Sequence, residues 1–288
     1  MSVLSVLQTG TNTPEARQLR ALLASLVFAT MIGPYNFASA RQGGDSPDYG
    51  FDFVTITHPG NAPFVPVNPP NPFFNSGTRG RVGYEYRIAR VEVTTGQWLQ
   101  FVNTFWTQGE IPGGEFIPSI WGAVRDPNYD VPGRRFRLAS DSPDAAMRPV
   151  FGITWREAAK YCNWLCNDQS SSPLSLLNGA YDAATFTGNP NGTLNDQLTH
   201  NPGARFWIPT WDEWLKAAHY DPNRYGPGQE GYWQYDTMSE TQPTPGPPGV
   251  GETSAGYRIP PFGHYDIPLG AYPETVSPWG LLDLSLIH

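Results

Sequence analysis

Residues 204–222 read A-R-F-W-I-P-T-W-D-E-W-L-K-A-A-H-Y-D-P, and this stretch decides how the fold is interpreted. It predicts a short apolar strand at 206–208, which Pro209 ends because proline has no N–H to give to a neighbouring strand. Thr210 and Glu213 are spaced as a capping box, in which each side chain bonds the other residue's backbone N–H. A helix with one apolar face is therefore predicted after Thr210, and the closing Asp-Pro pair is predicted to end it.

Capping boxes of the same kind open two further predicted helices, at 94–105 and 154–166. Each follows a predicted strand, at 84–93 and at 148–153. In the first helix, Trp, Phe, Val and Phe stand at i, i+3, i+4 and i+7, a spacing typical of a stripe that faces the core. A further strand is predicted at 51–57, where apolar and polar residues alternate.

Long irregular segments separate these elements. Residues 109–144 and 167–202 are rich in Gly, Pro, Asn and Ser and are predicted to be loops, the second with a small hairpin around 178–181. Residues 231–235 predict a short aromatic strand, and residues 241–251 form another Pro/Gly loop.

The composition indicates an irregular globular protein. The chain has 288 residues, with 30 glycines, 30 prolines and 14% aromatic residues, so many turns are combined with many large side chains that can fill a core. Charged residues make up 15%, and the formal net charge is −8. An acidic chain without a basic cluster is a poor partner for nucleic acid or for an anionic membrane surface.

Residues 1–40 are predicted to be an export signal. Arg17 and Arg20 supply a positive flank, residues 21–33 form an apolar core too short to span a bilayer, and residues 38–40 are a small-residue cleavage site. The mature chain is then expected outside the cytoplasm, in the periplasm or at the cell surface, with no transmembrane segment. The alternative for this region is a buried N-terminal helix.

The two cysteines of the chain, Cys162 and Cys166, stand four residues apart on one predicted helix. Helical backbone resists a disulfide at this spacing, so a site that binds a soft metal through two thiolates is one interpretation. Two buried, inert thiols are the other, and the one that the residue type favours.

Five segments resemble, in the same order, motifs of the formylglycine-generating enzyme family, also called the sulfatase-modifying factor domain. They are 86–94 (Y-R-I-A-R-V-E-V-T), 148–165, 178–181 (N-G-A-Y), 204–221 and 279–284 (W-G-L-L-D-L). No single motif is specific, and it is their order over most of the chain that carries the resemblance.

The resemblance implies an α+β fold with little regular secondary structure, related to C-type lectin-like folds. It also implies oxidation of a sulfatase cysteine to formylglycine, with oxygen, copper held by two cysteines, and structural calcium. After 279–284 the family continues G-N-V-W-E-W toward its catalytic cysteines, whereas this chain continues S-L-I-H. Neither Cys162 nor Cys166 lies at the family's catalytic positions, so no catalytic, cofactor-binding or metal-binding residue is carried over.

The expected organisation is a signal peptide at 1–40, a strand with a Pro-rich N-terminal extension at 41–80, and a partial sulfatase-modifying-factor-like domain at 81–288, incomplete at its C-terminus. The first hypothesis is an exported member of the family, inactive as this truncated chain. The second is a non-catalytic, lectin-like binding module for glycan or protein at the cell surface, for which exposed Trp and Tyr would suit sugar stacking.

Overall fold

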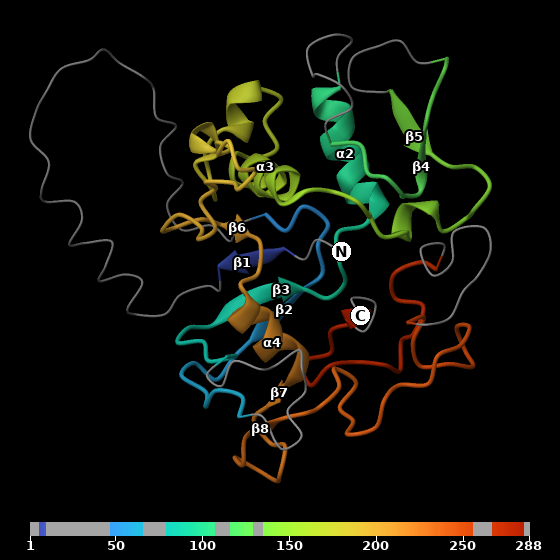
Figure 1. Ribbon diagram of the computed structural model, residues 1–288. Helices are drawn as coiled ribbons and strands as arrows, with labels where there is room; N and C mark the ends of the chain where they lie inside the picture. The colour runs from blue at the N-terminus through green and yellow to red at the C-terminus, as the bar shows by residue number, and fades with distance from the viewer. Residues whose placement is uncertain are drawn as a thin grey trace, which may run out of the picture.

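The computed structural model of the chain shows a mixed α+β arrangement, in which helices pack around small antiparallel sheets (Figure 1). The α+β prediction is confirmed, and the relation to lectin-like folds stays a prediction. The structure describes residues 6–9, 47–65, 79–106, 116–128, 135–255 and 267–284.

A four-stranded sheet lies at the centre of the molecule, with the strand order β2-β3-β1-β6. Every neighbouring pair in it is antiparallel. The strands are β1 (Leu7–Thr9), β2 (Phe53–Ile56), β3 (Tyr86–Ala89) and β6 (Phe206–Trp207). The strands at 51–57, 84–93 and 206–208 were therefore correctly predicted as elements, although each is shorter than expected.

The three α-helices of the described residues are α2 (Thr95–Phe105), α3 (Trp155–Cys166) and α4 (Trp211–His219). All three predicted capping boxes are present, with both reciprocal hydrogen bonds formed in each. Helix α4 ends before the Asp-Pro pair, because Tyr220 is already extended and begins β7 (Tyr220–Asp221), which pairs with β8 (Gly231–Tyr232). The aromatic strand expected at 231–235 is thus a two-residue strand.

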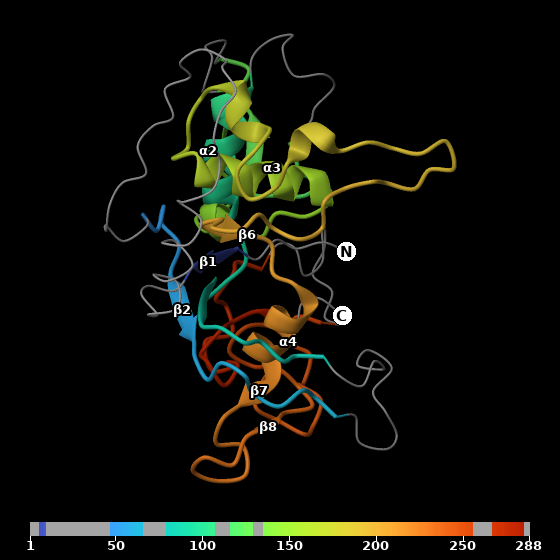
Figure 2. The same cartoon turned by 90° about the vertical axis from the view of Figure 1, so that its left-hand side faces the viewer.

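The sheet separates two hydrophobic clusters, because successive side chains of a strand point to opposite faces. Figures 1 and 2 both place α2 and α3 on one side of the sheet and α4, β7 and β8 on the other. We call the first of these the aromatic cluster. Its buried members are Val6, Phe51, Ala89, Val93, Trp98, Phe101, Val102, Phe105, Phe116, Phe136, Val150, Ile153, Ala158, Tyr161, Trp164, Leu165 and Phe206. We call the second the α4 cluster. Its buried members are Leu7, Ile56, Val82, Tyr86, Ile88, Ala159, Cys162, Ala180, Tyr181, Ala204, Trp207, Trp214, Leu215, Ala217, Ala218, Leu281 and Leu284.

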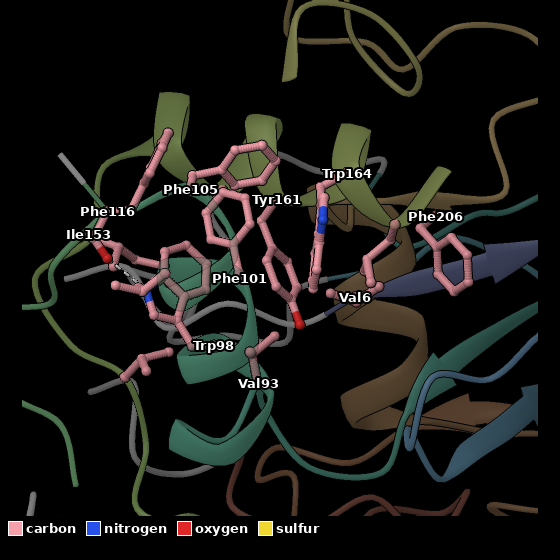
Figure 3. Close-up of a cluster of buried hydrophobic side chains, with 14 of the residues drawn as sticks. Val6, Val93, Trp98, Phe101, Phe105, Phe116, Ile153, Tyr161, Trp164 and Phe206 are labelled. Atoms are coloured by element: carbon pink, nitrogen blue, oxygen red, sulfur yellow. Dashed lines mark hydrogen bonds between the residues drawn. The ribbon is translucent and has the colours of Figure 1, made fainter. Parts of the chain in front are cut away.

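Phe101 of α2 lies at the centre of the aromatic cluster (Figure 3). Its ring centroid lies 5.1 Å from that of Trp98, 5.2 Å from that of Tyr161 and 5.3 Å from that of Trp164. Tilted and edge-on ring pairs at such distances stabilise a core beyond the area they bury. The Trp98 indole N–H donates to the Phe116 carbonyl at 2.7 Å, whereas the buried Trp164 indole N–H has no hydrogen-bond partner among the described residues.

Two predictions for residues 109–153 were wrong. The loop expected at 109–144 contains β4 (Ala123–Arg125) and β5 (Phe136–Leu138), which pair with each other and were too short to be recognised. The strand expected at 148–153 makes only isolated bridges, because Pro149 has no N–H to donate and Gly152 adopts a positive φ of 79°.

The hairpin expected around 178–181 is also absent. The segment is held instead by Asn163 of α3, which is fully buried. Its Nδ2 donates to the carbonyls of Leu176 and Tyr181, and its Oδ1 accepts from the Tyr181 N–H at 2.8 Å. A side-chain amide therefore replaces the strand pairing, and short 3-10 helices, η5 (Pro173–Leu176) and η6 (Ala183–Thr185), flank the contact.

The four-stranded sheet contains strands from all three expected ranges, 1–40, 41–80 and 81–288. Strand β1 lies inside the first range and β2 inside the second, and both belong to the same sheet as β3 and β6. The other parts of the expected export signal lie outside the described residues. None of the described helices combines the length and the apolar character needed to cross a membrane.

The capping box of α4 differs from that of α2, because Glu213 accepts more hydrogen bonds than Gln97 does. The buried carboxylate of Glu213 accepts hydrogen bonds from the Thr210 N–H and hydroxyl, and also from the Tyr84 hydroxyl and the Trp207 indole N–H. Glu213→Ala leaves these donors without an acceptor, so we expect the free energy of unfolding to fall by about 3 kcal/mol or more.

The matched control is Gln97→Ala in the capping box of α2, where the side chain bonds only the part-buried Thr94 and the exposed Gly50 carbonyl, so the expected loss is about 1 kcal/mol. Urea denaturation of the two variants measures both values. Equal losses would show that the additional contacts of Glu213 contribute no stability.

Candidate functional site

The cysteine pair lies one turn apart on α3, and neither thiol is in a disulfide. Cys162 has no exposed surface and belongs to the α4 cluster. Burial raises the pKa of the Cys162 thiol well above its usual value, and the neighbouring Cys166 raises it further. The Cys162 side chain therefore behaves as a small apolar group of the core.

Cys166 connects α3 to β6. Its Sγ accepts from the Phe206 N–H and donates to the Phe206 carbonyl, each at 3.4 Å. The Arg205 guanidinium donates to the Cys166 carbonyl and, at 2.8 Å, to the Asp168 carboxylate. Burial raises the pKa of the Cys166 thiol, although the Phe206 N–H acts in the opposite direction. The contacts of this thiol are those of a packing residue that aligns a strand with a helix.

The copper that the family resemblance implies does not fit this pair. Copper binds thiolates, whereas burial holds both thiols in the protonated form. An ion would also have to enter the core beside Cys162 and displace the bonds between Cys166 and Phe206. Of the two interpretations of the cysteines, the structure favours inert thiols.

A buried pair of carboxylates is a second unusual feature. Glu92 follows β3, its side chain is 2% exposed, and neither of its oxygens has a hydrogen-bond partner among the described residues. Burial raises the pKa of Glu92 well above its usual value, and the charge of Asp283 raises it further. Burial also raises the pKa of Asp283, to about 6, against the effect of the Gly270 N–H that donates to it.

The two acids therefore titrate in sequence. Asp283 ionises first, and its charge then opposes ionisation of Glu92, which stays neutral well above the pH range normal for a glutamate. Asp283 also lines a small pocket with polar and apolar walls. The pocket is formed by Asp236, Thr237, Glu252, Thr253, Tyr272, Thr275, Leu281, Asp283 and Leu284.

Lys216 of α4 is a third buried ionisable group. Its Nζ donates to the His58 carbonyl at 2.9 Å and lies 5.8 Å from the centroid of the Tyr220 ring. Burial lowers the pKa of Lys216 from 10.5 to about 8, while Glu85 and Glu230 act in the opposite direction. Because the side chain has no exposed surface, it holds the turn after β2 against α4 and is closed to a substrate.

These groups do not converge on one centre. Among the described residues, no group of three or more His, Cys, Asp or Glu side chains is arranged to hold a metal ion. The sequence singled out neither Glu92 nor Lys216. The sequence carried no signal for Glu92, because the alternating run V-E-V predicts an acidic side chain on the solvent-facing side of the strand.

Comparison with known proteins gives one match. The sequence model of the sulfatase-modifying factor enzyme 1-like domain matches residues 75–285, which is more than half of the chain. No curated protein and no solved structure matches the chain.

Thiol labelling tests whether the cysteines are inert. In the native protein, we expect an aromatic disulfide reagent to label Cys162 slower than a free thiol by a factor of about 10³ or more, because labelling requires the core to open. In denaturant both thiols should react at once. Cys166→Ala is the control, since it leaves only the Cys162 signal. Rapid native labelling of that variant would contradict the buried packing role.

The Glu92 carboxyl gives a pH-dependent prediction. Below about pH 4.5, its usual value, the group is protonated in both the folded and the unfolded chain. Above that pH only the unfolded chain releases the proton, so this group lowers the free energy of unfolding by about 1.4 kcal/mol per pH unit until the raised folded pKa is reached. Glu92→Gln removes this slope, so its stability relative to the wild type should increase with pH.

Urea denaturation at pH 4, 6 and 8 measures this effect. The control is Asp283→Asn, which removes the Asp283 titration between pH 3.8 and about 6 and, by removing its charge, should narrow the pH range over which Glu92 lowers the free energy of unfolding. Parallel pH profiles for the wild type and Glu92→Gln would show that Glu92 is not held neutral.

Proposed function

Because the chain belongs to the sulfatase-modifying factor enzyme 1-like family, we propose that it uses the family scaffold without itself oxidising a protein cysteine to formylglycine. In the family, that oxidation depends on copper held by two reactive cysteines. The proposal concerns this chain as it stands, and the substrate of the family reaction would be a cysteine of a partner protein.

The placement of the two thiols is the observation that supports the proposal. Both cysteines of the sequence lie on α3, where Cys162 is enclosed by the core and Cys166 is bonded to the backbone of β6. A redox thiol needs a lowered pKa and access to its partner. Burial raises the pKa of both thiols and restricts access to them. The lectin-like binding module is not favoured by the family match, and we do not propose it.

The test is an oxidation assay. The purified protein is incubated with Cu(I), oxygen, a reductant and a cysteine-containing peptide from a sulfatase active site, and mass spectrometry follows conversion of the thiol to the aldehyde. We expect no aldehyde above the level given by the Cys162→Ala/Cys166→Ala variant, and less than one tightly bound Cu(I) per chain. Aldehyde that forms with the wild type and not with this variant would disprove the proposal.

Strand β1 lies within residues 1–40, the range of the expected export signal, and belongs to the central sheet.

A further inference from the structure

Strand β1 occupies a central position in the four-stranded sheet. It pairs with β3 on one side and with β6 on the other, so that Leu7 lies opposite both Ile88 and Trp207. No pairing joins β3 directly to β6 in the described sheet. Without β1, the sheet would consist of the β2–β3 pair and an isolated two-residue β6, with unpaired backbone groups on both sides of the gap.

The side chains around β1 belong to both hydrophobic clusters. Val6 points into the aromatic cluster, near Trp164 and Phe206 in Figure 3, whereas Leu7 points into the α4 cluster. Neither side chain has any exposed surface. Removal of β1 would therefore open a cavity on each face of the sheet.

Polar contacts fix the register of β1 as well. The Ala89 N–H donates to the Val6 carbonyl at 3.1 Å. Gln8 is fully buried, and its Oε1 accepts from the Arg87 guanidinium at 2.5 Å. Burial of a glutamine is favourable only when its amide is bonded, and here the charged partner comes from the neighbouring strand.

An export signal at residues 1–40 is incompatible with this position of β1. During export, the positively charged flank before the apolar core stays on the cytoplasmic side, and the chain after the core is translocated. Residues 6–9 would then be separated from β3 and β6 by the membrane, or be cut off with the signal. In either case the space between β3 and β6 would lose its strand.

We propose that the space between β3 and β6 is a strand-acceptor site whose permanent occupant is the chain's own segment 6–9. The N-terminal segment then stays in the folded protein, the chain is not cut after Ala40, and the N-terminus shares a compartment with the domain. This inference is independent of the proposed function, because it concerns maturation and not the chemistry of the thiols.

Two substitutions in the full chain separate this proposal from the export hypothesis. Leu7→Ala removes a side chain that only a retained β1 would bury. Leu22→Asp places a charge in the apolar core of the expected signal. The full chain, with a tag at its C-terminus, is expressed in a secreting bacterial host, and its intact mass, its cellular fraction and its melting temperature are measured. Hydrogen exchange of the peptide covering residues 6–9 is measured on the wild type.

The proposal predicts a mass that includes residues 6–9, protected amides in that peptide, and a melting temperature lowered by about 5–15 °C in Leu7→Ala. Leu22→Asp should leave the chain uncut after Ala40 and should not change the cellular fraction. A stronger variant, Leu7→Asp, should fail to fold or melt lower still.

Three results would overturn the proposal. They are a mature protein that starts near residue 41, an unchanged melting temperature in Leu7→Ala, and a Leu22→Asp protein that accumulates unprocessed while the wild type is exported.

Discussion

The buried carboxylate of Glu213 is the interaction on which the arrangement of the sheet and α4 depends. It caps the helix through Thr210 and accepts hydrogen bonds from Tyr84 beside β3 and from Trp207 of β6. The backbone carbonyl of Glu213 also accepts from the Tyr86 hydroxyl of β3. One residue therefore fixes where the helix begins and which two strands it covers. Such a connection is needed here because the strands are short, and a two-residue strand has too few ladder bonds to define its own position.

The buried ionisable groups have local structural roles. Cys162 fills space in the α4 cluster, Cys166 aligns β6 with α3, and Lys216 holds the turn after β2. Perturbed pKa values often mark active sites, but they arise equally where a fold encloses polar groups for packing. Glu92 and Asp283 differ from the others, because Glu92 has no hydrogen-bond partner among the described residues and Asp283 borders a pocket. Because folding raises the pKa of both acids, the stability of the protein depends on pH whether or not the two groups have a chemical role.

The sequence predicted those parts of the fold that local chemistry determines. The three capping boxes need only four residues each, and the apolar stripe of α2 follows from helical spacing alone, so these elements were found. The parts that depend on distant partners were missed. Strand β1 has only three residues and becomes a strand through β3 and β6, and Asn163 holds the segment before Tyr181 by contacts that no sequence pattern displays. For the cysteines the sequence left two interpretations open, because spacing on a helix does not reveal which face the core covers.

The position of β1 also affects the order in which the protein can fold. Leu7 pairs with Trp207, so the innermost strand of the sheet is made among the first residues and completed only after about 200 more have been synthesised. At about 5–20 residues per second, the ribosome needs on the order of ten seconds or longer to supply β6. During that time Val6 and Leu7 have no second neighbouring strand, and contacts so distant in sequence slow folding through the entropy of closing a long loop. The central strand of the sheet is therefore completed late, after most of the described residues have been synthesised.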